Sequence, residues 1–252
     1  MAQTRSMTLW TGILAVAAVT VLSGHVAPSV DDNNRYVKVT PMAGGARLAY
    51  TVFFGENPGA AERKQLDTNR DGRIDPGEAT SFGDRLAGEI AANLTVEAGG
   101  RAARIRWTVV DVGLGNDSVA AGSFSVDMIG YLCVAGTPHR LVVRDAFRIP
   151  RPGETEVKVE DSPGVAISRA RVGDADDPRH DYRFVGAGGP LTDAGLEVEW
   201  TDSAQAPLLP PGTCTAEPAS TSSRPWLLPV IGIGAVIAAL AGFLIVKRRR
   251  AS

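Results

Sequence analysis

Short runs in which apolar and polar residues alternate fill most of the chain between residues 30 and 202. Arg47–Phe54 and Arg104–Val109 are two such runs, and Gly and Pro clusters separate them from the others. Alternation with a period of two is typical of a strand that buries one face. The remaining runs lie at 124–133, 140–147, 157–159, 165–172, 182–184 and 196–200. About eight or nine short strands are therefore predicted, which favours a mainly β fold built as an antiparallel β-sandwich.

One segment of twelve residues interrupts this β pattern with oxygen-bearing side chains at regular spacing. Counted from Asp67 to Glu78, carboxylate or amide side chains stand at positions 1, 3, 5, 9 and 12, and Gly72 stands at position 6. Calcium takes about 6–8 hard oxygen ligands, so a chain that binds it has to wrap around the ion and turn sharply midway. Glycine makes such a turn at low cost because it has no Cβ. The residues with a carboxylate or amide side chain are Asp67, Asn69, Asp71, Asp75 and Glu78.

Both flanks of this loop carry helix signals. On the N-terminal side, Asn57 can cap a short helix and Pro58 suits its first position. On the C-terminal side, Asp75 and Glu78 have the spacing of a capping box, and an apolar stripe with members four residues apart predicts a helix that ends near Asn93. The stripe consists of Phe82, Leu86 and Ile90. We expect it to pack on the sheet.

Residues 57–93 resemble a single EF-hand, and the loop matches that family at every ligating position. The resemblance implies one Ca²⁺, with Asp75 acting through a water molecule and Glu78 binding in bidentate fashion. The backbone carbonyl of Arg73 would supply the ligand at position 7. The remaining ligands implied are Asp67, Asn69 and Asp71.

Two departures from the family lower the affinity that the resemblance implies. Arg70 and Arg73 lie inside the loop, so its formal charge is only about −2. A second hand is also missing from the sequence. Paired hands couple through the residue at position 8, here Ile74, so this hand has to rest on another part of the chain. The alternative is a former calcium loop that now only caps a helix.

The two ends of the chain predict export and membrane anchoring. Residues 1–24 combine one cation, an apolar run and small residues, which is the layout of a secretory signal peptide. Residues 226–246 are 21 uncharged, mostly apolar residues, enough to span a bilayer as a helix. The basic tail at 247–252 is then expected in the cytoplasm and residues 25–225 outside, in a single-pass protein of the cell membrane. An uncleaved anchor at the N-terminus is the alternative.

Charge and cysteine content fit an exported domain. The chain has 26 Lys and Arg against 28 Asp and Glu; five of the cations lie in the two terminal segments, and the other 21 leave residues 25–225 with a formal charge of −7. An acidic surface argues against nucleic acid as a partner. Cys133 and Cys214 would both lie outside, where a disulfide persists. Two unpaired thiols are the alternative.

The domain expected from these signals covers residues 25–201 and contains the EF-hand insertion. A division into two smaller β-domains near 150–153 stays open. Residues 202–225 are rich in Pro, Ser, Thr and Ala, so they are predicted to form a flexible stalk. Within the membrane helix, small residues at every fourth position would allow a weak homodimer, although such a composition is also ordinary for a transmembrane helix. These residues are Gly234, Ala238 and Gly242.

The sequence does not indicate an enzyme, because it carries none of the common catalytic or phosphate-binding motifs. We expect a structural or interaction module, stabilised by one Ca²⁺ and facing an unknown protein partner. The alternative function is handling or sensing of a transition metal, copper or nickel. If cleavage exposed His25 as the new N-terminus, its amine and imidazole could chelate the metal, with His139 or His180 as a further ligand.

Overall fold

The computed structural model describes residues 30–186 and 189–214. Contacts divide the chain into two compact units, and the division falls between Thr213 and Cys214. The predicted signal peptide (1–24), membrane helix (226–246) and cytoplasmic tail (247–252) lie outside the described residues. Among the described residues, no helix is long and apolar enough to cross a membrane.

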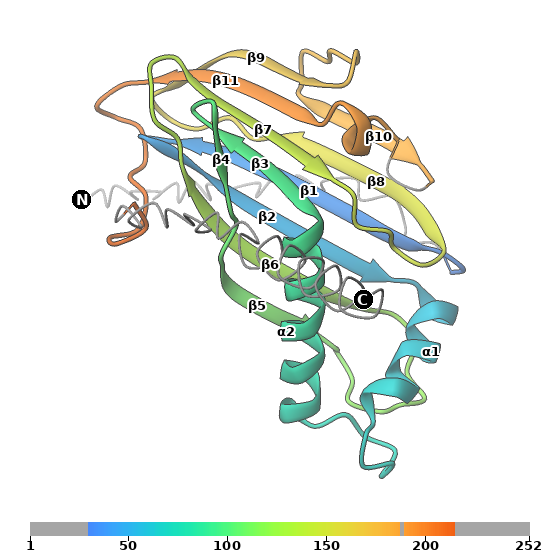
Figure 1. The fold of residues 1–252 in the computed structure, drawn as a ribbon. Helices are drawn as coiled ribbons and strands as arrows, with labels where there is room; N and C mark the ends of the chain where they lie inside the picture. The colour runs from blue at the N-terminus through green and yellow to red at the C-terminus, as the bar shows by residue number, and fades with distance from the viewer. Residues whose placement is uncertain (1–29, 187–188, 215–252) are drawn as a thin grey trace, which may run out of the picture. The chain divides into compact units, whose positions relative to one another are not determined.

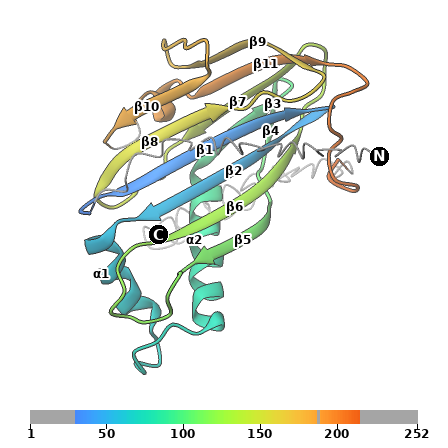
Figure 2. The same cartoon turned by 180° about the vertical axis from the view of Figure 1, so that it is seen from behind.

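The chain is mainly β, with two sheets, as Figure 1 shows. The first sheet has six strands in the order β10-β8-β1-β2-β6-β5, which can be followed from behind in Figure 2. Its members are β1 (Asn33–Met42), β2 (Gly45–Phe54), β5 (Trp107–Gly113), β6 (Phe124–Cys133), β8 (Pro152–Val159) and β10 (Asp181–Val185). The second sheet has five strands in the order β4-β3-β7-β11-β9. Its members are β3 (Leu94–Ala98), β4 (Arg101–Ala103), β7 (His139–Asp145), β9 (Val165–Val172) and β11 (Leu196–Asp202).

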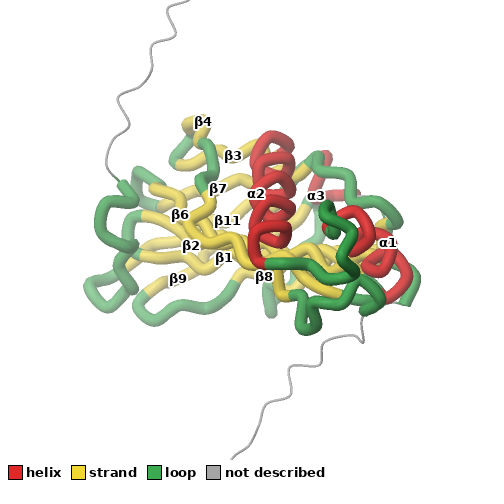
Figure 3. The backbone as a smooth tube through the Cα atoms, turned by 90° about the horizontal axis from the view of Figure 1, so that it is seen from below, coloured by secondary structure: helices red, strands yellow, loops and turns green. Residues whose placement is uncertain are grey.

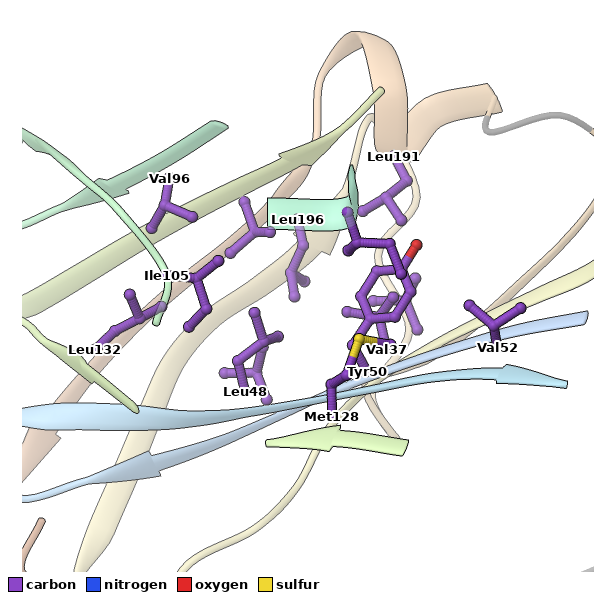
Figure 4. Close-up of a cluster of buried hydrophobic side chains, with 14 of the residues drawn as sticks. Val37, Leu48, Tyr50, Val52, Val96, Ile105, Met128, Leu132, Leu191 and Leu196 are labelled. Atoms are coloured by element: carbon purple, nitrogen blue, oxygen red, sulfur yellow. The ribbon is translucent and has the colours of Figure 1, made fainter. Parts of the chain in front are cut away.

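The hydrophobic core lies between the two sheets, which is consistent with a β-sandwich. Alternate residues of the long strands are buried, as the period-two pattern predicts. Val37, Leu48 and Met128 come from the first sheet, and Val96 and Leu196 come from the second (Figure 4). Tyr50, Leu141 and Trp200 are fully buried in the same cluster.

The pairing of the strands differs from the prediction in one respect. β1 pairs with β8 in parallel, whereas every other strand pairing between the named strands is antiparallel. The chain leaves β7 in the second sheet before it enters β8 in the first, and such a crossover allows β8 to run in the direction of β1. The described residues also contain eleven strands rather than the predicted eight or nine, because β1, β3 and β4 were not recognised from the sequence.

Two helices lie between β2 and β3, where the insertion was predicted. α1 spans Glu56–Leu66 and α2 spans Pro76–Asn93; a short third helix, α3 (Gly189–Asp193), precedes β11. The capping box of Asp75 and Glu78 is present, so the predicted start of α2 is confirmed. The cap predicted for α1 is wrong, because the helix begins two residues earlier and Asn57 lies inside it, where its side chain donates to Asp31.

The apolar stripe of α2 packs on the sheet, as predicted. Phe82, Leu86 and Ile90 are all buried, and α2 contacts β5. The ring of Phe82 lies 5.9 Å from those of Phe54 and Phe124, which come from β2 and β6. Gly83 allows a close approach of helix and strand, because a Cβ there would lie 2.9 Å from Val112 and 3.0 Å from Val110.

Residues 203–213, which the composition places in the stalk, are attached to the domain. Pro207 accepts a hydrogen bond from the amide of Ala43, and Ala206 is buried. The compact unit therefore extends to Thr213, about twelve residues beyond the predicted boundary at 201. Cys133 and Cys214 are both disulfide-bonded, so neither is a free thiol.

Candidate metal centre

The loop predicted to bind calcium joins the end of α1 to the start of α2, at the end where the two helices project below the sheets in Figure 1. Figure 3 shows both helices from below. Asp67 is the C-cap of α1, and Asp75 is the N-cap of α2. Gly72 has φ of +86°, the left-handed conformation that the sequence predicts for the glycine at position 6. Arg70 also adopts positive φ, at +62°. The backbone therefore turns sharply at the middle of the loop.

The side chains at positions 1, 3 and 5 turn toward the backbone amides of their own loop. Asp67 accepts hydrogen bonds at Oδ1 from the amide of Asp71 (3.1 Å) and at Oδ2 from the amide of Gly72 (3.0 Å). Asn69 Oδ1 accepts from the amide of Asp71 (2.9 Å), and Asp71 Oδ1 accepts from the amide of Arg73 (2.9 Å). These bonds gather the oxygens of Asp67, Asn69 and Asp71 on the inner side of the turn.

Glu78, at position 12, reaches from α2 back to the start of the loop. Its Oε1 accepts from the amide and the hydroxyl of Thr68, both at 2.7 Å, and from the amide of Asn69 at 3.2 Å. Its Oε2 accepts from the amide of Asp75 at 3.1 Å. The hydrogen bond from the Thr68 side chain, followed by that from the Asp75 amide, lowers the pKa of Glu78 below its ordinary value. The carboxylate is therefore charged at neutral pH.

The charge of Arg73 is directed away from the loop. Its guanidinium forms an ion pair with Asp117, which lies in the connection between β5 and β6. The pair offsets one of the two cations that lower the affinity implied by the sequence. Ile74, at position 8, is buried, and its amide donates to the carbonyl of Asp117 at 2.8 Å. The part of the chain on which this single hand rests is thus the β5–β6 connection.

The structure brings the six predicted ligand residues into one short loop, but it does not close them into a ring. Among residues 30–186 and 189–214, no group of three or more His, Cys, Asp or Glu side chains is arranged to hold a metal ion. The carboxylate of Glu78 is engaged by Thr68. The donors of the loop are all hard oxygens, which suit calcium better than a soft transition metal. The chemistry of the donor set therefore fits Ca²⁺.

The residues that support this loop from outside do not follow from any pattern in the sequence. Arg63 is fully buried and donates to five backbone carbonyls of the β5–β6 connection, which we define as residues 114–123. Burial lowers the pKa of Arg63, and the charge of Glu56 opposes that change. Nothing in the sequence marks Arg63, because its partners are backbone groups more than 50 residues away.

The histidines proposed for a transition metal are not assembled in the described part of the chain. His25 lies outside the described residues. His139 is buried beside Trp200, with Nδ1 2.9 Å from the carbonyl of Val134 and Nε2 3.2 Å from Asp202. The alternative function thus gains no support from the described residues.

No protein-family model matches the chain, and no curated protein matches it either. The function is therefore inferred from the site itself.

Proposed function

We propose that this chain is a calcium-binding, single-pass membrane protein whose extracytoplasmic β-domain is stabilised by one Ca²⁺. The observation that carries the proposal is the loop between α1 and α2, where the oxygens of Asp67, Asn69 and Asp71 gather on the inner side of a turn made by Gly72. The carbonyl of Arg73, Asp75 through a water molecule and Glu78 complete the proposed ligand set. The domain would serve as a structural or interaction module.

Binding of calcium requires a change at Glu78. Its carboxylate now accepts from Thr68 and Asn69, and to ligate an ion beside Asp67 it has to exchange those bonds for the metal. Both oxygens belong to a side chain that starts on the first turn of α2, so the exchange needs a rotation of one side chain and no rearrangement of either helix. Calcium would then link the end of α1 to the start of α2.

The membrane part of the proposal rests on the sequence. The predicted signal peptide at 1–24 and the predicted span at 226–246 lie outside the described residues, and by the positive-inside rule we expect the β-domain outside the cell. Calcium modules outside cells work with Kd values of about 10⁻⁴–10⁻³ M, so even a modest affinity would suffice for such a role.

Calcium at millimolar concentration is expected to raise the Tm of the purified full chain, and magnesium to raise it less. A ligand that binds only the folded state stabilises it by about 2.7 kcal/mol at a hundredfold excess over Kd. For a domain of this size that corresponds to roughly 5–10 °C. Glu78→Gln removes the charge of one ligand and is expected to abolish the gain. Thermal unfolding, followed by calorimetry with and without calcium, measures both effects.

The matched control for this experiment is Glu89→Gln, the same change at an exposed position of the same helix. It is expected to keep the full calcium-dependent rise in Tm. A wild-type melting curve that calcium leaves unchanged would refute the proposed function. An equal loss in both variants would show that the change in net charge, and not the ligand, matters.

Without calcium, the stability that Glu78 contributes is expected to depend on pH. The folded pKa of Glu78 is lowered, so its contribution is fully present above the unfolded pKa and is lost as the pH falls through the folded value. In calcium-free buffer at pH 7, the Tm of wild type is thus expected to be higher than that of Glu78→Gln. The difference in Tm is expected to vanish in strong acid. A difference that stays constant from pH 7 to pH 2 would contradict this assignment.

A further inference from the structure

The β5–β6 connection lies against the outer side of the candidate calcium loop. Arg73 and Ser118 form an antiparallel bridge, although neither belongs to a named strand. Two backbone hydrogen bonds flank this bridge, from the amide of Ile74 to the carbonyl of Asp117 (2.8 Å) and from the amide of Val119 to the carbonyl of Gly72 (3.1 Å). The loop is thus paired along its edge with a segment from another part of the chain.

This pairing fixes the direction of the Arg73 carbonyl. In an extended segment, the backbone groups of successive residues point to opposite sides. The carbonyl of Gly72 and the amide of Ile74 both face the connection, so the amide and carbonyl of Arg73 face the other way. The amide of Arg73 does face away from the connection, because it donates to Asp71 Oδ1 on the inner side of the loop. The carbonyl of Arg73 therefore points to the side where the carboxylates gather.

The connection is itself held in place by Arg63 of α1. The five donors of its guanidinium are all used, and its charged group lies 5.3 Å from the centre of the Phe124 ring. The carbonyl acceptors, at 2.6–3.2 Å, belong to Leu114, Asn116, Ser118, Gly122 and Ser123. Gly59 adds a close backbone contact, because a Cβ there would lie 2.7 Å from the carbonyl of Gly122. The helix that enters the loop and the segment that borders it are thus fixed to each other.

We propose that the β5–β6 connection, held by Arg63, orients the Arg73 carbonyl before calcium binds and so sets the calcium affinity of the loop. Arg63 is then a positioning residue, since it acts through the connection and does not touch the ion. The inference rests on the proposed function, because it concerns the same site. The physical effect is preorganisation: a loop whose backbone is already ordered loses less entropy when it binds its ligand.

The first test is Arg63→Lys, with Arg85→Lys as its control. Lysine keeps the charge but lacks the planar fork that reaches several carbonyls at once. Arg85 lies on α2 over the ring of Phe82, and none of the hydrogen bonds to residues 114–123 comes from it, so the same substitution there keeps the charge near the loop and leaves the connection unchanged. Calorimetric titration of the full chain with calcium is expected to show a Kd about three- to tenfold weaker for Arg63→Lys, the scale of one hydrogen bond, and no change for Arg85→Lys.

The second test removes one backbone hydrogen bond between the loop and the connection. Val119→Pro lacks the amide that donates to Gly72, whereas Val119→Ala keeps that amide and shortens the side chain. A weaker Kd is expected only for the proline variant. Europium serves as a probe with a spectroscopic signature, since its luminescence lifetime in H₂O and D₂O counts bound water. Both Arg63→Lys and Val119→Pro are expected to bind about one more water than wild type, in place of a poorly directed carbonyl.

The outcomes separate this inference from the function on which it rests. If wild type does not bind calcium, the proposed function fails. If wild type binds but Arg63→Lys and Val119→Pro match it in Kd and water count, the positioning role is refuted and the calcium site stands. Equal weakening by Val119→Ala and Val119→Pro would also refute it. Should both variants fail to fold, amide hydrogen exchange in wild type decides: protection of Val119 and Ile74 before calcium is added supports preorganisation, and free exchange overturns it.

Discussion

Arg35→Met is expected to lower the free energy of unfolding by about 3–5 kcal/mol, because it leaves a buried carboxylate without its cation. Arg35 lies on β1, almost fully buried, and Nη1 is 2.5 Å from Asp145 Oδ2 at the end of β7 in the other sheet. Tyr50 also donates to that oxygen, at 2.7 Å. Burial raises the pKa of Asp145, although the charge of Arg35 and the hydrogen bond from Tyr50 oppose the rise. Urea unfolding of the purified chain measures the loss.

Lys38→Met is the matched control, since Lys38 lies on the same strand but on the solvent side. Its ion pair with Glu160 is partly exposed, so the loss is expected to stay below about 1 kcal/mol. The double variant Arg35→Met with Asp145→Asn is expected to recover part of the stability, because no unpaired charge then remains buried. If Arg35→Met lowered the free energy of unfolding no more than Lys38→Met, the ion pair of Arg35 and Asp145 would not stabilise the packing of the two sheets.

Arg63→Met is expected to cost about 3 kcal/mol or more, with or without calcium. Methionine fills much of the same volume but leaves five carbonyls of the β5–β6 connection without their charged donor. Urea unfolding measures the loss of stability, and amide exchange of residues 114–123 is expected to rise in the folded protein.

Arg85→Met serves as the comparison, because that arginine is exposed and its main contact is the face of Phe82. Its loss is expected to cost about 1 kcal/mol or less. If Arg63→Met were as mild as Arg85→Met, water would be able to replace the guanidinium at the five carbonyls. The connection would then be held by its own turns and by the strands on either side.

Local patterns predicted most of the strands and the helical insertion. The period-two alternation of β2 and β6 is clear because one face of each is apolar and buried. α2 was predicted from its capping box and apolar stripe, both of which span only a few residues. β1 was missed because its first three residues, Asn33, Asn34 and Arg35, are polar and nevertheless buried. Partners from distant parts of the chain, such as Asp145, make that burial favourable, and a local pattern does not contain them.

The candidate site, too, is predicted by the sequence only in part. The ligand positions follow from spacing within twelve residues, and the capping geometry of Asp75 and Glu78 is as predicted. The support of the loop depends on backbone hydrogen bonds with residues 114–123, more than 40 positions away. A carbonyl has no side-chain identity, so no residue type in the connection indicates that Arg63 binds there. The parallel pairing of β1 with β8 escapes prediction for a similar reason, since it depends on where the chain crosses between the sheets.

The hydrogen bonds of Arg63 to both ends of the β5–β6 connection have a practical consequence for protein engineering. Its guanidinium donates to the carbonyl of Leu114 at one end and to that of Ser123 at the other, so the distance between the two ends is set by hydrogen bonds to a single side chain. An epitope or a fluorescent tag inserted there would put the five hydrogen bonds to Arg63 at risk. The turn at 174–179, between β9 and β10, is mostly exposed and is the better place for a label. In the described part of the chain, no single side chain donates hydrogen bonds to both of its ends.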